Sequence, residues 1–161
     1  MADTLDHRDV QAAETGRRVG RIAGRIGVLA LLPFIVLAAW LASIALDHPW
    51  RAGTISLLTT WSALYLTFLG GIRWGVAIGD SRSAAARDLA LSALSLVLGW
   101  AAFAAPIPYT FAALAVVYAA VGAWDSLASH AQAAPAWYGR LRVWQTIIIV
   151  VTLIVAFVAT S

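Results

Sequence analysis

Long apolar runs constrain this chain more than any other feature of its sequence. Between Ile26 and Leu46, the only hydroxyl or charged side chain is Ser43. A helix of this length rises roughly 31 Å, about the thickness of the hydrocarbon layer of a bilayer. Charged residues make up only 12% of the 161 residues, about half the share found in soluble domains. The sequence therefore predicts an all-α helical bundle embedded in a lipid bilayer.

Polar turns divide the chain into five predicted transmembrane helices. A tail of residues 1–25 precedes one membrane domain, residues 26–161. Pro106 and Pro108 separate the third helix from the fourth, and these two could instead form a re-entrant hairpin if their turn stayed in the membrane. Pro135 lies in the longest predicted connection, between the last two helices. The predicted spans cover residues 26–46, 52–79, 89–105, 109–124 and 142–160.

The arginines lie mostly on one predicted side of the membrane. Nine belong to the N-terminal tail and to the second and fourth connections, whereas Arg51 lies on the opposite side and Arg73 within a span. Such an excess marks the cytoplasmic side, so we predict a multi-pass protein of the bacterial inner membrane with its N-terminus in the cytoplasm and its C-terminus outside. Arginines beside apolar runs indicate attraction to a membrane surface, and we expect no nucleic-acid partner. The basic tail is interpreted as lying on that surface, or alternatively as an arm that binds a partner.

One stretch, residues 65–80, combines glycines with a charge inside a predicted span. Gly71, Gly75 and Gly79 are spaced four apart, and Gly70 precedes them. On a helix the three equally spaced glycines form one flat strip, the small-xxx-small pattern that lets a second helix approach closely in lipid. We therefore expect this strip to pack against a neighbouring helix.

Arg73 is the charge within that span, about 9 Å from its cytoplasmic end. A charge at this depth is costly and indicates a paired or functional role. Asp125, at the inner end of the fourth span, is the expected partner, with Asp80 and Asp88 as alternatives. Two interpretations stay open: a structural ion pair between Arg73 and Asp125, or an arginine that binds an anionic ligand or headgroup.

Two tyrosines belong to the same candidate site. Tyr65 and Tyr118 lie at mid-membrane depth on the helices that carry Arg73 and Asp125. A buried phenol hydroxyl needs a hydrogen-bond partner, so each tyrosine is expected either to pack in the core or to help bind a ligand.

Residue types that perform chemistry are scarce. The chain has no cysteine, which excludes disulfides and cysteine nucleophiles. His7, His48 and His130 all lie outside the predicted spans, and no acidic or histidine cluster has the spacing of metal ligands. No nucleophile elbow or phosphate-binding loop is present. We expect no metal, no cofactor and no enzymatic activity.

Two motifs resemble a known family. The segment FLGGIRWG, Phe68 to Gly75, is similar to the FLGG-I/V-R/H-WG signature of small polytopic proteins typified by transmembrane protein sixty-nine. A second segment resembles that family's D…P-x-W-Y-x-x-L-R pattern and reads from Asp125 through Pro135, Trp137 and Tyr138 to Leu141 and Arg142. The Leu141–Thr146 segment departs slightly from the usual pattern. The resemblance implies an inner-membrane protein with relatives in mitochondria and no assigned activity.

A weaker resemblance points to the tryptophan-rich sensory and translocator proteins, which also have five spans and bind porphyrins or sterols. Only Pro49-Trp50 represents their proline-flanked tryptophan loop. The first functional prediction is an accessory or assembly factor beside a larger membrane complex, as a partner subunit or a homo-oligomer. The alternative is a binding module or carrier for a small amphipathic or anionic molecule.

Overall fold

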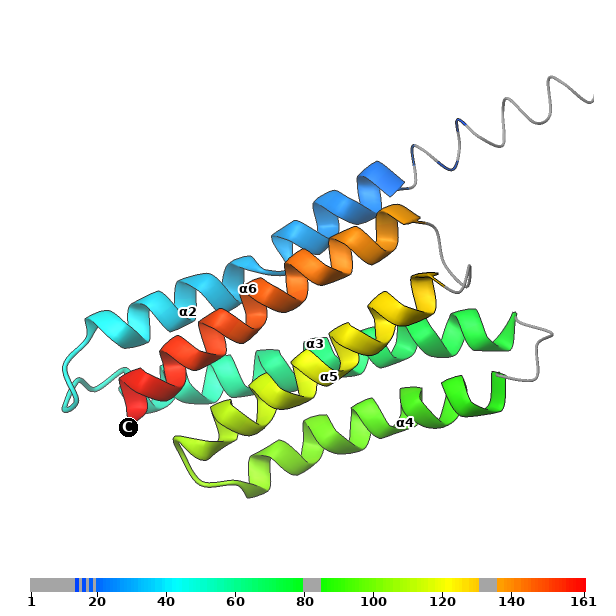
Figure 1. Cartoon of the computed structure of the whole chain (residues 1–161). Helices are drawn as coiled ribbons and strands as arrows, with labels where there is room; N and C mark the ends of the chain where they lie inside the picture. Colours follow the sequence, from blue (N-terminus) through cyan, green and yellow to red (C-terminus); the bar gives the residue numbers. More distant parts are fainter. Residues whose placement is uncertain (1–13, 15, 17, 19, 80–84, 131–135) are drawn as a thin grey trace, which may run out of the picture.

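The computed structural model describes residues 14, 16, 18, 20–79, 85–130 and 136–161, and these residues form helices and no strand (Figure 1). The predicted all-α fold is therefore confirmed. The elements are α2 (Leu32–Ser43), α3 (Arg51–Ile78), α4 (Ala85–Ala101), the short 3-10 helix η1 (Ala102–Ala104), α5 (Tyr109–His130) and α6 (Ala136–Thr160). A further helical stretch, residues 20–29, precedes α2.

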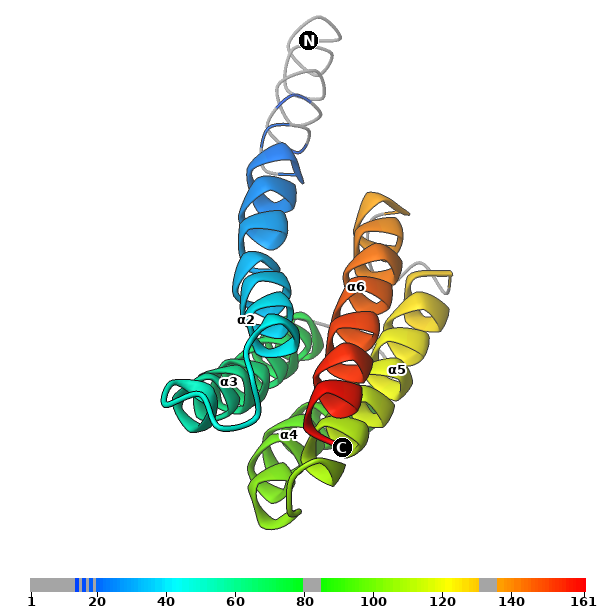
Figure 2. The same cartoon turned by 90° about the vertical axis from the view of Figure 1, so that its left-hand side faces the viewer.

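The helices run alternately up and down one bundle, and neighbours in sequence are mostly neighbours in space (Figures 1 and 2). Helix α3 packs against α4, α5 packs against α6, and α2 packs against both α3 and α6. The α2–α3 and α4–α5 connections lie at the end of the bundle that holds the C-terminus (Figure 1). The end that lies opposite is where α3 and α5 finish and where α4 and α6 begin.

Four helical segments in the described part of the chain are long and apolar enough to cross a membrane: Gly20–Ser43, Arg51–Ile78, Ala86–Ala104 and Gly139–Thr160. Helix α5 is 22 residues long and includes Asp125, and it is not among the four. The chain is thus a helical membrane protein, and the count of five spans remains a prediction.

The first span is interrupted near Pro33. Proline has no N–H and disturbs the helical ladder in the preceding turn. Leu31 donates its N–H to the carbonyl of Val28 at 3.0 Å. This bond spans three residues instead of the four of an α-helix, so the turn is tighter. The indole Nε1 of Trp61, in α3, donates to the carbonyl oxygen of Ala30 at 3.3 Å. A side chain of the neighbouring helix therefore satisfies a backbone group at the interruption, as membrane burial requires.

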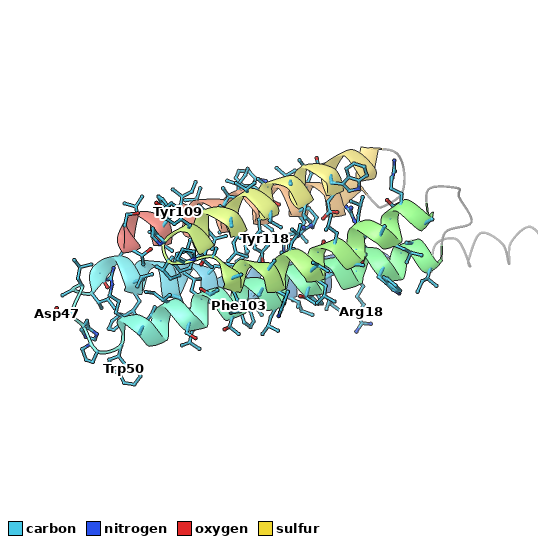
Figure 3. The ribbon with its side chains drawn as sticks, turned by 90° about the horizontal axis from the view of Figure 1, so that it is seen from below. Arg18, Asp47, Trp50, Phe103, Tyr109 and Tyr118 are labelled. Atoms are coloured by element: carbon cyan, nitrogen blue, oxygen red, sulfur yellow. The ribbon has the colours of Figure 1, made fainter. Side chains whose placement is uncertain are left out.

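Three aromatic rings form the centre of the bundle. Phe34 is fully buried and meets Tyr65 and Tyr118 edge-on, with ring centroids 5.7 and 6.0 Å apart. Figure 3 places Tyr118 between the helices, while Asp47 and Trp50 lie at one end of the bundle. Large apolar side chains such as Leu57 and Val116 are exposed on the exterior. An apolar exterior around a packed core is the arrangement that a lipid solvent favours.

Helix α3 begins and ends one residue before the predicted span 52–79, but the ends of α5 and α6 were predicted wrongly. Helix α5 continues to His130 instead of ending at residue 124, and α6 begins at Ala136 instead of residue 142. Gly139 is buried within α6 and does not interrupt it. Asp125 and Arg142 therefore lie inside helices, each facing the core.

The predicted glycine strip does not pack within the bundle. Gly71 and Gly75 are exposed, and a Cβ added at either would meet no atom within 4 Å. Among the described residues, a Cβ at Gly79 would meet the carbonyl oxygens of Val76 and Gly75, from its own helix. The neighbouring Gly70 is the close-packed glycine: a Cβ there would lie 2.8 Å from the carbonyl oxygen of Ser92 in α4, whose hydroxyl donates to the Gly70 carbonyl. One residue turns a helix by about 100°, and this rotation separates the packed face from the predicted strip.

Arg51 joins the C-terminal ends of two helices at the other end of the bundle. Its guanidinium donates to the carbonyl of Ile44 at 3.3 Å, just after α2, and to the carbonyl of Ala159 in α6. Carbonyls at a helix C-terminus have no partner within the helix and carry its partial negative charge. The single arginine predicted on this side therefore satisfies groups from α2 and α6.

Candidate functional site

Asp125 is the centre of a buried charge cluster made by three helices. Its Oδ1 forms an ion pair with Nη2 of Arg73, from α3. Its Oδ2 accepts hydrogen bonds from Arg142, in α6, whose Nε and Nη2 both lie 2.8 Å away. The structure thus brings together Arg73 and Asp125, as the ion-pair interpretation expects, and adds a second arginine to the carboxylate.

Arg142 is the most deeply buried charge of the three, with 2% of its side chain exposed against 9% for Asp125 and 14% for Arg73. The sequence predicts an interfacial motif of Pro135, Trp137, Tyr138 and Arg142, and it counts Arg142 among the cytoplasmic arginines. Because α6 starts before the predicted span, Arg142 lies in its second turn and faces α5. Gln145 lies three residues further on, where i and i+3 side chains share a face, and would have indicated a polar face.

The first helical stretch also reaches the cluster through a glycine. Oε1 of Gln145 lies 3.5 Å from Nη1 of Arg142. The other end of this amide packs against Gly27, where an added Cβ would lie 2.5 Å from Nε2. A larger residue at position 27 would require the end of the Gln145 side chain to move. The charge cluster (Arg73, Asp125, Arg142 and Gln145) therefore touches four helical segments.

Trp124 covers one side of the cluster. The guanidinium carbon of Arg73 lies 5.9 Å from the centre of its ring, and that of Arg87, in α4, lies 4.9 Å away. Both distances are within the range of cation–π attraction. The indole Nε1 of Trp124 is buried with no hydrogen-bond partner among the described residues. Trp124 thus connects α4 to the ion pairs of α3, α5 and α6.

The alternative partners of Arg73 have other positions. Asp88 pairs with the adjacent Arg87, at 3.9 Å from its Nε, while Asp80 lies outside the described residues. Pro135 also lies outside them, as do the side chains of Trp137 and Tyr138 from the same predicted motif. Of this motif, the structure therefore places Asp125 and Arg142 in the cluster.

The two tyrosines lie deeper and belong to the aromatic core. The hydroxyl of Tyr118 donates to the backbone carbonyl of Ser62 at 2.6 Å. Tyr65 contacts Phe34 edge-on and stacks on Phe68 with ring centroids 6.0 Å apart. These contacts fit the packing interpretation of both residues and place Tyr118 in a link between α5 and α3.

The cluster holds helices together by pairing charges. An unpaired charge in a membrane interior is costly, and breaking a buried pair typically costs about 3–5 kcal/mol. Two arginines on one carboxylate leave the group with a net positive charge. Among the residues that the structure describes, no three histidine or acidic side chains gather as metal ligands would.

Fold and cluster together define the class: a polytopic helical membrane protein whose helices are joined by buried ion pairs. Within that class the chain belongs to the family described as "Protein of unknown function (DUF3429)", whose model matches residues 19–158. No curated protein and no solved structure matches the chain. The relation to proteins typified by transmembrane protein sixty-nine remains a prediction.

Proposed function

We propose that the protein is a non-enzymatic accessory or assembly factor that supports a larger complex of the bacterial inner membrane. The observation that carries this proposal is the engagement of the charge cluster inside the bundle. Arg73 and Arg142 both contact Asp125, and Arg73 also lies against Trp124. Side chains committed to each other favour a structural role over the alternative of a carrier that binds an anionic ligand through Arg73.

The charge distribution supports the proposed orientation. Arg21, Arg25 and Arg87 are exposed at the end of the bundle where α3 and α5 finish. Arg51 lies at the other end and is engaged with helix carbonyls. With Arg142 removed from the count because it is buried, the excess of arginines still supports a cytoplasmic N-terminus. Five spans then place the C-terminus outside.

The exterior of α3 offers a place to test for a partner. Among the described residues, no other helix packs against the strip of Gly71, Gly75 and Gly79, and Phe68 and Trp74 are exposed on α3. Small residues are enriched where transmembrane helices meet. A partner helix that packs on this strip would fit the proposed accessory role.

The experiment is a pull-down of the tagged full-length protein in a mild detergent, with mass spectrometry of the captured proteins and small molecules. We expect one protein in stoichiometric amount, captured by the wild type and lost from Gly75→Leu. Gly53→Leu is the matched control, because it adds the same side chain to the same helix where a Cβ also meets nothing. Equal capture by the two variants would exclude the strip, and a bound small molecule without a protein would favour the carrier.

A further inference from the structure

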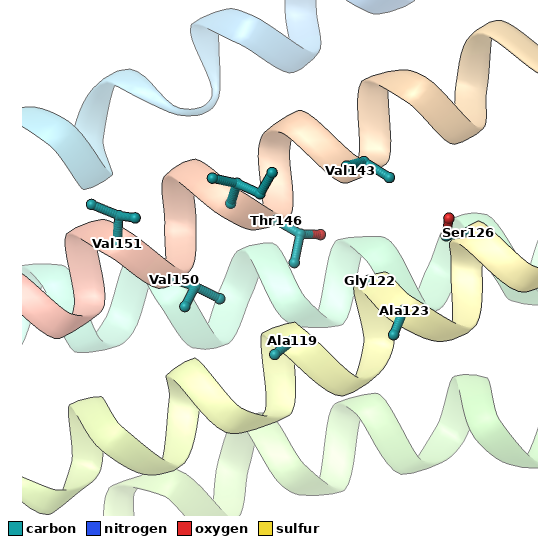
Figure 4. A pocket seen from close by; sticks show the side chains of 9 residues that line it. Ala119, Gly122, Ala123, Ser126, Val143, Thr146, Val150 and Val151 are labelled. Carbon is teal, nitrogen blue, oxygen red and sulfur yellow. The ribbon is translucent and has the colours of Figure 1, made fainter.

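A groove of about 400 Å³ runs along the outside of α5 and α6 (Figure 4). One side consists of small residues of α5, and the other consists of branched residues of α6, all apolar except Thr146. The lining residues are Ala119, Gly122, Ala123, Ser126, Val143, Thr146, Ile147, Val150 and Val151.

The groove exists because the two helices meet at one glycine. A Cβ at Gly122 would overlap the side chain of Thr146, so the two helices are in contact there. A larger residue at position 122 would push them apart. Beside this contact, Ala119 and Ala123 are too short to fill the space between the helices. Both alanines are exposed, as is Ile147 on the α6 side of the groove. In a membrane protein such a face meets lipid.

A positive charge lies at one end of the groove. Arg140 is exposed and precedes Val143 by three residues, so both lie on the same face of α6 as Ile147 and Val151. The rise from Arg140 to Val151 is about 16 Å along the helix, close to half of a 30 Å hydrocarbon layer. The neighbouring Arg142 faces inward to Asp125, whereas Arg140 faces outward. The groove thus combines one leaflet's depth of apolar wall with a cation at the interface.

We propose that this groove binds one anionic phospholipid of the leaflet on the Arg140 side. An acyl chain fills the space between Ala119, Ala123 and Ile147, and the phosphate lies against the Arg140 guanidinium. Small residues admit a chain that larger ones would exclude, and arginines close to the membrane surface attract anionic headgroups. This inference is independent of the proposed accessory role, because the groove lies on α5 and α6, whereas the partner is tested on the glycine strip of α3.

The test uses the full-length protein, stripped of lipid in mild detergent and titrated with phosphatidylglycerol or with phosphatidylcholine of the same acyl chains. Native mass spectrometry counts the lipids that stay bound. We expect one phosphatidylglycerol to be retained and bound several-fold more tightly than phosphatidylcholine. Arg140→Gln should weaken phosphatidylglycerol binding about fivefold, as expected for one arginine near the surface, and leave phosphatidylcholine unchanged. Ala123→Phe, which fills the groove, should weaken both lipids.

Two control variants match these changes elsewhere on the bundle. Arg25→Gln removes an exposed arginine at the same end, and Ala93→Phe enlarges an exposed alanine on α4. Neither should alter the count of bound lipids. Equal losses from Arg25→Gln and Arg140→Gln would overturn the proposal, as would full binding by Ala123→Phe. A dimer that Ala123→Phe dissociates would show instead that a second copy covers the groove. Arg140→Gln, a surface change, keeps the test valid if Ala123→Phe does not fold.

Discussion

Asp125 forms ion pairs with arginines from two helices at once, and these pairs give the sharpest prediction at the scale of single residues. Arg142→Ala should destabilise the protein by up to about 3–5 kcal/mol, because it removes the most deeply buried charge and leaves Asp125 paired with the partly exposed Arg73. Arg73→Ala should cost less, because 14% of its side chain is exposed and the carboxylate keeps Arg142. Denaturant unfolding in mild detergent measures both free energies.

The cluster also predicts how changes combine. Removing Asp125 takes the shared carboxylate from two arginines at once, so Asp125→Ala should be worse than Arg73→Ala. The double variant Arg73→Ala/Asp125→Ala should be destabilised by less than the sum of the two single variants. Either single change already removes the ion pair between the two residues, so the second change does not remove it again. Strictly additive costs would contradict the energetic coupling of this pair. Ser43→Ala, at an exposed helix end, serves as the control for detergent effects.

Part of this site could be predicted from the sequence and part could not. Arg73 stands alone in an apolar span, so its need for a partner is visible, and Asp125 is the acidic residue at matching depth. Arg142 was missed because it lies in a segment with two aromatic residues and a preceding proline, a composition typical of an interface. Its inward direction depends on where α6 begins and how it is rotated, and that is decided by packing against α5.

At the scale of the helix, the contrast between Gly70 and Gly71 separates packed glycines from exposed ones. Gly70→Leu should destabilise the bundle by several kcal/mol, since its Cβ would meet the Ser92 carbonyl at 2.8 Å and would push α4 from α3. Gly71→Leu adds the same side chain next to it and should change stability by less than about 1 kcal/mol, because nothing lies within 4 Å. Thermal unfolding of both variants in detergent makes the comparison.

The two adjacent substitutions control for each other, because both give up the same helix-destabilising glycine. Equal destabilisation would mean that Gly71 also packs, either within this chain or against a second copy. A loss at Gly71 that appears only at high protein concentration would indicate the second copy.

The apolar runs predict the helices better than they predict the helix ends and the packed faces. Helix α3 lies between clear turns, so its bounds were nearly right. The C-terminal end of α5 and the N-terminal end of α6 are polar. Polar residues near a membrane surface predict a loop unless their buried partners are known. The four-residue glycine spacing correctly describes a flat strip on α3. Periodicity fixes which residues share a face, but it does not say which face turns inward.

For the whole molecule, the arginine distribution predicts a topology that fusion proteins can measure. With five spans and a cytoplasmic N-terminus, alkaline phosphatase fused after Ser161 should be active, and green fluorescent protein at the same position should be dark. Fusions after Asp80, in the predicted cytoplasmic connection, should give the opposite pair of signals. An inactive phosphatase at the C-terminus would mean that the span count is wrong by one, and α5 would be the helix to reconsider.

The position of Asp125 between its two arginines in the sequence sets the order in which the cluster assembles during synthesis. Helix α5, with its aspartate, is synthesised after Arg73 and before Arg142, which follows 17 residues later. At roughly 5–20 residues per second, the ribosome needs about 1–3 s to cover that distance. In the five-span arrangement, Arg73 is the cluster cation already in place during this interval. Arg73 would then pair with Asp125 while α5 enters the bilayer. Arg142 would add the second ion pair once α6 is inserted.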